Sequence, residues 1–325
     1  MANTANGWHF ERGLDPNFMT KLALLAANGG WFADVLADSR LILGIRNNYL
    51  NVYWRGQSLF KIEWAAGKDV PLKFSTHPKY LLDPALSNAV RFDGSDFKIG
   101  TLTPLIKEYA GAKTLARMKR AAELYCGDEK RGVHQVVLAN PNVIDTEIAF
   151  VCDGMDEDNP FAPRMDLACL EEVDSSIRLR FWEAKLFVNR ELFAEGDKEA
   201  PVVGQIRDYR ILVEKHRAEI IKSYQFVAQN LAGIASWGAS PREVGPLIKR
   251  VADGETLVID DVPIVGLIVY GYDDAQGKSE RWKSHLDKLT RDENTPVRCA
   301  GDAKNIRLKH PKTIAFPLVR RGMRI

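Results

Sequence analysis

The chain has few cysteines, and none of them stand at a spacing that would hold a metal ion. Its 325 residues include four cysteines, and no two form a C-x-x-C pair. Structural zinc is therefore disfavoured, and a chain of this length needs no disulfide framework to stabilise its core. We expect reduced thiols and a cytoplasmic protein.

Long apolar runs and leader-like segments are also missing. The first seven residues lack a charged region followed by an apolar run, so we expect no secretory signal. The longest apolar stretch, around residues 262–272, is too short to cross a bilayer, so we expect no membrane partner. The composition, 46% hydrophobic and 27% charged, is that of a globular protein with a core. A net charge of +2 neither demands nor excludes a polyanionic partner.

Several common catalytic signatures are absent from the sequence. Its six histidines form no H-x-H or H-x-x-x-H pair, which disfavours a histidine metal site. The glycines match neither a P-loop nor a dinucleotide-binding fingerprint, and there is no G-x-S-x-G elbow. The chemistry must therefore come from other side chains.

The first hundred residues predict a β-rich N-terminal domain (residues 1–100) of unknown role. Helical spacing over residues 18–36 is interrupted by Gly29-Gly30. Alternating patterns and turn residues then predict a meander of three strands, at residues 41–45, 49–54 and 58–64. This region serves either as a separate recognition domain or as a decoration on the main sheet.

Residues 101–292 predict an α/β domain with a mixed central sheet flanked by helices. A helical region opens at Thr103-Pro104 and ends near Gly127. Three strands, a long helix, a strand and a short amphipathic helix follow, at residues 143–151, 164–170, 177–188, about 203–232, 262–272 and 279–289. Short turns make the first three strands antiparallel, whereas the long helix makes the fourth parallel to its predecessor.

The remaining residues, 293–325, form a basic C-terminal segment. From Arg298 onward it contains eight lysines and arginines and a single acidic residue, Asp302. Such a segment suits phosphate contacts, although a solvated tail explains it equally well.

The triplet Glu183-Ala184-Lys185 is the most informative feature of the chain. It stands inside a strand that is otherwise hydrophobic. Because alternate residues of a strand share a face, Glu183 and Lys185 point the same way. Unpaired buried charge is costly, so these groups need partners.

Hairpin registers supply those partners. A turn centred between Asp174 and Ser175 places Asp166 directly across from Glu183. Pairing of the first two strands about a centre near residue 157 places Glu147 across from Asp166. Three carboxylates on adjacent strands repel one another, and a hard divalent cation relieves that repulsion. Oxygen ligands without histidine or cysteine favour Mg²⁺ or Mn²⁺.

On these residues the chain resembles the PD-(D/E)XK phosphodiesterase superfamily, which has the restriction-endonuclease-like fold. The family places an acid on its second core strand and E-x-K on its third, as Asp166 and Glu183-Ala184-Lys185 stand here. The resemblance covers roughly residues 103–290 and implies an αβββαβ core. The family's proline before the aspartate is replaced by Met165.

The resemblance also implies roles for individual residues. Asp166, Glu183 and the Ala184 carbonyl would bind the metal, with Lys185 as the catalytic lysine. Glu147 matches an additional upstream acid that serves the metal site and catalysis. Gln205 and Tyr209 match a Q-x-x-x-Y element on the next helix, which supports the site or touches nucleic acid.

The resemblance therefore implies a Mg²⁺- or Mn²⁺-dependent nuclease that hydrolyses phosphodiesters with a metal-activated water. DNA is favoured over RNA and internal cleavage over exonuclease action, and the family admits a homodimer. A catalytically silent nucleic-acid-binding module on the same fold is the alternative. An enzyme acting on small phosphorylated molecules is a third reading.

The triplet alone is weak evidence, because the chain contains three more of them. Asp96-Phe97-Lys98, Asp128-Glu129-Lys130 and Asp302-Ala303-Lys304 follow turns or lie in polar, turn-like surroundings. The alternative is that Glu183 and Lys185 form an exposed pair on a solvated strand face. Strand-forming hydrophobic residues on both sides of the triplet favour the site.

Overall fold

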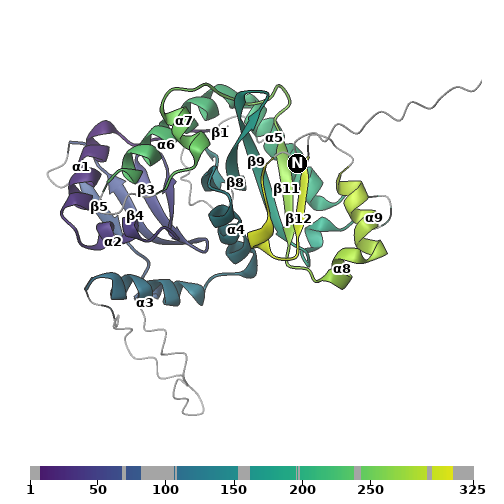
Figure 1. Ribbon diagram of the computed structural model, residues 1–325, viewed down its shortest axis with the longest axis horizontal. Coiled ribbons are helices and arrows are strands. Elements are labelled where there is room, and N and C mark those ends of the chain that lie inside the picture. Colours follow the sequence, from purple (N-terminus) through teal and green to yellow (C-terminus); the bar gives the residue numbers. More distant parts are fainter. Residues whose placement is uncertain are drawn as a thin grey trace, which may run out of the picture.

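A computed structural model shows a mixed α/β protein (Figure 1). It describes residues 8–67, 71–81, 106, 108–152, 162–194, 196, 198–237, 243–290 and 295–309. Within them, a four-stranded sheet lies at the left of Figure 1 and a six-stranded sheet right of its centre, with helices α6 (Arg217–Ala235) and α7 (Pro246–Ala252) between them. None of the helices in these ranges is long and apolar enough to cross a membrane.

The N-terminal region folds as two helices and an antiparallel meander. Helices α1 (Pro16–Ala27) and α2 (Trp31–Ala37) are separated at Gly29 and Gly30, whose φ angles of 75° and 76° suit glycine. The strands are β2 (Ile42–Ile45), β3 (Tyr49–Trp54), β4 (Gln57–Trp64) and β5 (Leu72–Ser75). The three expected strands are confirmed. The fourth, β5, was missed because it is a short, largely exposed edge strand.

The larger sheet is mixed. Its strands are β6 (Val143–Ala149), β8 (Arg164–Val173), β9 (Ser176–Leu186), β10 (Leu257–Val258), β11 (Val265–Tyr270) and β12 (Val297–Ala300). The order is β12-β11-β9-β8-β6, and β10 also pairs with β9. Strands β6, β8 and β9 are antiparallel, and β11 is parallel to β9, as expected. Strand β12 was missed, since the basic residues that follow it dominate the pattern.

A two-stranded ribbon pairs β1 (Trp8–His9) with β7 (Val151–Cys152).

Helices cover both faces of the larger sheet. Alternate residues of β9 divide between them, because successive strand side chains point to opposite faces. Phe181 belongs to the core beneath α5 (Pro201–Lys215) and α6, whereas Trp182 packs with Val133 and Val136 of α4 (Asp128–Ala139). This alternation places Glu183 on the face of α5 and α6.

Two helices differ from the expectation. The long helix over residues 203–232 is two helices, α5 (Pro201–Lys215) and α6 (Arg217–Ala235), which are interrupted at His216 by a non-helical backbone (φ −103°, ψ 18°). The expected helix end at Gly127 is wrong. Helix α3 (Ala112–Glu123) ends earlier, and Gly127 precedes a further helix, α4 (Asp128–Ala139). Thr103 and Pro104 lie outside the described residues.

Short helical elements complete the chain. They are α7 (Pro246–Ala252), α8 (Asp274–Lys278), α9 (Glu280–Leu289) and the 3₁₀ turns η1 (Pro78–Tyr80), η3 (Arg190–Leu192) and η4 (Ala303–Asn305). Helix α9 confirms the amphipathic helix expected over residues 279–289. It packs Trp282 against the core.

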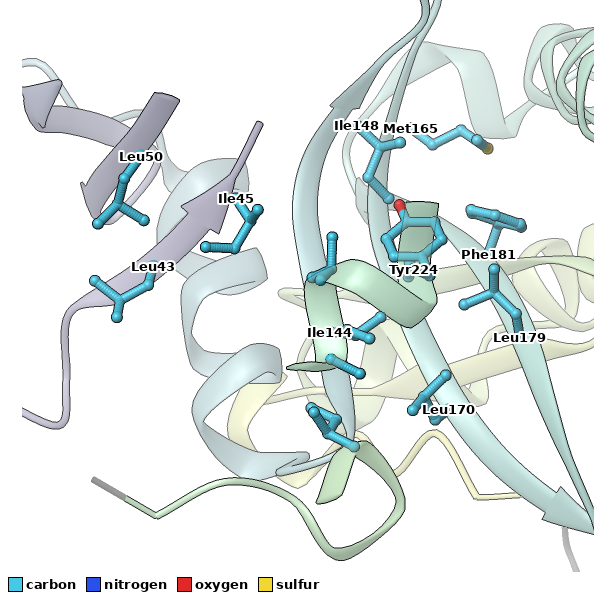
Figure 2. Packing of buried hydrophobic residues seen from close by; sticks show 14 of the residues in the cluster. Leu43, Ile45, Leu50, Ile144, Ile148, Met165, Leu170, Leu179, Phe181 and Tyr224 are labelled. Atoms are coloured by element: carbon cyan, nitrogen blue, oxygen red, sulfur yellow. The ribbon is translucent and has the colours of Figure 1, made fainter. Parts of the chain in front are cut away.

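The meander and the larger sheet share one hydrophobic core. Figure 2 shows Ile45 and Leu50 of the meander on one side of it and Ile148 and Phe181 of the larger sheet on the other. Tyr224 of α6 lies beside Phe181 on the larger-sheet side, with ring centroids 6.3 Å apart. Side chains from both sheets fill this core, so packing of the N-terminal region helps to fix the strands of the larger sheet that carry the candidate site.

A buried ionic cluster ties the two sheets together. Asp145 of β6 binds Arg46 (Nη1 to Oδ1, 2.7 Å) and Arg12 (Nε to Oδ2, 3.5 Å). Tyr224 donates its hydroxyl to the same carboxylate at 3.2 Å. Removing one partner of such a cluster leaves an uncompensated buried charge, which is strongly destabilising.

Candidate active site

Strands β8 and β9 bring Asp166 and Glu183 together. Leu167 pairs with Trp182, so the next positions along the ladder are Asp166 and Glu183, and the expected register is confirmed. The hairpin turns at Asp174 and Ser175, whose φ angles of 49° and 63° are those of a tight hairpin turn. Asp166 is held in place because its Oδ2 accepts a hydrogen bond from the amide of Ala184 at 2.9 Å.

Strand β6 places Glu147 beside Asp166. Thr146 pairs with Leu167 and Ile148 with Met165, so Glu147 lies in the expected register. Its backbone is left-handed (φ 54°), an unusual conformation for a glutamate that tends to occur at functional sites. Arg46 of the meander braces this irregularity by donating to the Thr146 carbonyl at 2.6 Å.

The lysine of the strand triplet lies against its own glutamate. Lys185 Nζ is 2.8 Å from Glu183 Oε1 and 2.7 Å from a carboxylate oxygen of Glu191 in η3. Glu183 and Lys185 are only 3% and 6% exposed. A solvated surface pair is therefore excluded.

A second lysine, which sequence reasoning missed, enters from helix α4. Lys130 Nζ lies 2.5 Å from Glu147 Oε1 and 3.5 Å from Asp166 Oδ1. Its stem lies close against the β3–β4 turn, because a Cβ at Gly56 would lie 2.8 Å from the Cβ of Lys130. The interpretation of Asp128-Glu129-Lys130 as turn-like is thus wrong, since these residues form the first turn of α4.

Helix α4 brings a further acid. The Oε2 atom of Glu129 accepts hydrogen bonds from the Leu186 amide (3.3 Å) and from Asn189 Nδ2 (3.2 Å). The helix therefore starts at the end of the sheet where the carboxylates gather. The sequence signal was present: an acidic first turn followed by Val133 and Val136 at helical spacing.

Burial and mutual repulsion perturb the ionisation of the carboxylates. Burial, with repulsion from Asp166 next, raises the pKa of Glu183 to about 8 despite the nearby Lys185 ammonium. Burial also raises the pKa of Asp166, against the attraction of Lys130. For Lys130, burial lowers the pKa, but Asp166 and Glu147 outweigh it and the net shift is upward. The pKa of Lys185 is likewise raised, because Glu183 and Glu191 outweigh burial.

The cluster carries more negative than positive charge. Five carboxylates meet three cationic groups, namely Glu129, Glu147, Asp166, Glu183 and Glu191 against Lys130, Lys185 and Arg164, whose Nη1 is 4.0 Å from Glu147. With every carboxylate ionised the excess equals the charge of one divalent cation, and in the metal-free protein the raised pKa of Glu183 lets a proton relieve part of it. Glu183 Oε2 is also buried, with no hydrogen-bond partner among the described residues. A buried acceptor without a donor is costly, and a cation would satisfy it.

The oxygen donors therefore fit Mg²⁺ or Mn²⁺ in chemistry, although they are not gathered into a ready-made cage. No group of three or more histidine, cysteine, aspartate or glutamate side chains in the described part of the chain is arranged to hold a metal ion. Lys130 explains this arrangement, since its ammonium lies between Glu147 and Asp166. A cation shared by those two carboxylates requires that ammonium to move.

Gln205 and Tyr209 of α5 act together one layer behind the carboxylates. Gln205 Nε2 donates to the Tyr209 hydroxyl at 2.7 Å, and that hydroxyl donates to the carbonyl of Arg164. Burial raises the pKa of Tyr209, with Glu183 as the next cause, so the phenol stays protonated as a donor. The pair anchors the start of β8, two residues before Asp166.

The basic C-terminal segment is described only to residue 309. This part packs by α4, where Asn140 donates to the Ile306 carbonyl at 3.0 Å. Arg298 lies over the ring of Trp182, on the face of the sheet opposite Glu183. These residues do not reach the carboxylates.

Comparison with family models, with curated proteins and with solved structures found no match to this chain. The candidate site therefore rests on its own geometry: three carboxylates on adjacent strands and two lysines from a strand and a helix, gathered at one end of a mixed sheet.

Proposed function

We propose that this protein is a metal-dependent nuclease of the PD-(D/E)XK type, with DNA as the favoured substrate. One observation carries the proposal. Asp166 and Glu183 are buried in register on adjacent strands, and burial together with repulsion from Asp166 raises the pKa of Glu183 to about 8 despite the Lys185 ammonium. The strand order and the helix that carries Gln205 and Tyr209 support the restriction-endonuclease-like core.

The proposed chemistry divides among the residues as follows. The oxygens of Asp166, Glu183 and Glu147 and the Ala184 carbonyl would hold a divalent cation, which would lower the pKa of a water and neutralise phosphoryl charge. Lys185, which remains charged, donates a hydrogen bond to the negative charge that develops on the phosphoryl oxygens. The Ala184 amide orients Asp166.

The test is a cleavage panel with the purified protein. Supercoiled and linear duplex DNA, single-stranded DNA and RNA are incubated with Mg²⁺ or Mn²⁺. We expect cleavage of DNA by the wild type and none by Asp166→Asn. The control Asp208→Asn, an exposed carboxylate on α5, should cleave as the wild type does. If no form of nucleic acid is cut with either metal, the enzyme proposal fails.

The second candidate is a silent nucleic-acid-binding module on the same fold. The pairing of Lys130 with Glu147 and Asp166 favours it, because an ammonium already supplies charge between two of the ligands. Calorimetric titration with Mn²⁺ separates the two functions. The nuclease should bind the ion and lose that binding in Asp166→Asn, whereas a silent module should bind none.

A further inference from the structure

A small polar pocket separates the candidate active site from the N-terminal meander. Its volume is about 160 Å³. One wall consists of Tyr49, Asn51 and Tyr53 of β3 with Ser58 of β4, and the other includes Glu147 and Arg164. Glu147 therefore belongs to both the carboxylate cluster and the pocket, so a molecule in the pocket lies one side chain away from the cluster.

The meander wall is organised by a chain of hydrogen bonds. Ser58 Oγ donates to Asn51 Oδ1 at 3.2 Å, and Asn51 Nδ2 donates to the Tyr53 hydroxyl at 2.8 Å. Arg46 donates to that hydroxyl at 3.3 Å. Asn51 is buried, yet its amide keeps a second N–H and a second lone pair beyond these bonds. A wall with fixed donors and acceptors suits the edge of a nucleobase.

Arg164, whose side chain is 37% exposed, is the arginine of the pocket that suits a phosphate group. Arg46 also lines the pocket but is buried and bound to Asp145, and Lys130 is bound to the acidic member of the pocket, Glu147. Arginine binds phosphate oxygens well because its guanidinium presents several donors in one plane. At about 30 Å³ per water the volume equals roughly five waters, which suits part of a nucleotide rather than a folded partner.

We propose that this pocket holds the nucleotide next to the scissile phosphate. Arg164 contacts the phosphate of that nucleotide, and Asn51 and Ser58 meet its base edge. The inference rests on the proposed nuclease function and deepens it, since it gives the N-terminal meander a role in substrate selection. It assigns the substrate class to nucleic acid rather than to small phosphorylated molecules that lack a base.

Filling the pocket tests the proposal. The probe is a fluorescent DNA oligonucleotide, whose binding in Ca²⁺ is measured by anisotropy. Ser58→Tyr places a ring in the pocket without altering a carboxylate, and we expect its Kd to rise about tenfold to a hundredfold. Ser75→Tyr, the same change at an exposed position of β5, should bind as the wild type does. An unchanged Kd in a folded Ser58→Tyr protein would overturn the proposal.

Photo-crosslinking provides a readout that needs no substitution. DNA substituted with iodouracil is irradiated with the wild-type protein, and crosslinked peptides are mapped after trypsin digestion. We expect crosslinks in the peptide of residues 47–55, which holds Tyr49 and Tyr53. Crosslinks confined to other peptides would contradict the pocket assignment even if Ser58→Tyr were unfolded.

The two proposals can fail separately. A wild type that cleaves DNA while Ser58→Tyr binds and cleaves normally leaves the nuclease intact and removes the pocket. In the second case the wild type neither cleaves DNA nor binds Mn²⁺, but it crosslinks through residues 47–55, and Ser58→Tyr binds DNA more weakly. That result would rule out the nuclease and retain the pocket as a DNA-binding site.

Discussion

The strand triplet Glu183-Ala184-Lys185 and the helix triplet Asp128-Glu129-Lys130 each supply a lysine to the carboxylate cluster of the candidate site, but to different members of it. On strand β9, residues two apart share a face, so Glu183 and Lys185 meet at 2.8 Å. On helix α4, residues two apart point in different directions. Asp128 is therefore turned to solvent, with its side chain 75% exposed, while Lys130 reaches Glu147 at 2.5 Å.

The two lysines consequently differ in what holds them. Lys185 is bound to the acid of its own strand and is almost completely buried. Lys130 belongs to another element, bridges acids of two strands and keeps a third of its side chain exposed. Under the proposed nuclease function, Lys185 would act in the reaction, whereas Lys130 would balance charge until a divalent cation took its place.

The largest effect is expected for Lys185→Met. Removal of a preorganised charge that stabilises the transition state costs about 10²–10³-fold in kcat. Single-turnover cleavage of DNA with saturating Mn²⁺ measures this loss. Lys130→Met should retain most of the rate under those conditions. Equal losses in the two variants would contradict the division of roles.

A pH titration of the metal-free protein tests the carboxylate side of the comparison. Glu183 has a folded pKa of about 8 and an ordinary value of 4.5. Between these values the folded state holds a proton that the unfolded state has lost, so the free energy of unfolding falls as pH rises. We expect a loss of a few kcal/mol across this window, measured by urea unfolding in EDTA.

Glu183→Gln is the control for that titration, because it cannot ionise. It should flatten the slope between pH 4.5 and about 8. A wild-type stability that rises with pH in this range would show that the lysines already compensate for Glu183, and that the site does not require a further cation.

An intermediate effect is expected for Lys130→Met in the metal-free protein. Breaking a fully buried ion pair costs about 3–5 kcal/mol, and partial exposure of Lys130 reduces the expected loss to about 1–3 kcal/mol. Mn²⁺ should restore this stability and bind more tightly than in the wild type, because no ammonium competes for Glu147 and Asp166. Urea unfolding and calorimetry measure the two effects.

Lys113→Met is the matched variant, since Lys113 is an exposed lysine in the first turn of α3. It should change neither stability nor Mn²⁺ affinity. If Lys130→Met bound Mn²⁺ more weakly than the wild type, Lys130 would be a supporting group rather than a competitor of the metal.

The comparison also explains which parts of the site the sequence could predict. The β8–β9 register follows from alternation and a local turn, so Asp166, Glu183 and Lys185 were placed correctly relative to one another. Lys130 depends on tertiary packing of α4 near the sheet, which no spacing within residues 128–130 encodes. The helix itself had a sequence signal in its acidic first turn and in Val133 and Val136, but Gly127 was interpreted as a helix end.

Other features depend on contacts between distant segments. The left-handed backbone of Glu147 is braced by Arg46, about a hundred residues earlier in the chain. The pairing of Asp145 with Arg12 and Arg46 joins the meander to the larger sheet. A single sequence does not reveal such ion pairs. A buried charged residue and a solvated one look the same in the sequence, and they differ only in their burial in the folded protein.

The smallest effect is expected for Asp128→Asn, the acid of the helix triplet. Its bond to Arg131 is exposed, and an acidic residue in a first turn contributes only about 0.3–1 kcal/mol through the helix dipole. Cleavage and Mn²⁺ affinity should stay at the wild-type level, in contrast to Glu183→Gln. A loss of metal affinity in Asp128→Asn would mean that the start of α4 tunes the site electrostatically. The acid of the helix triplet, like Glu183 of the strand triplet, would then contribute to metal binding.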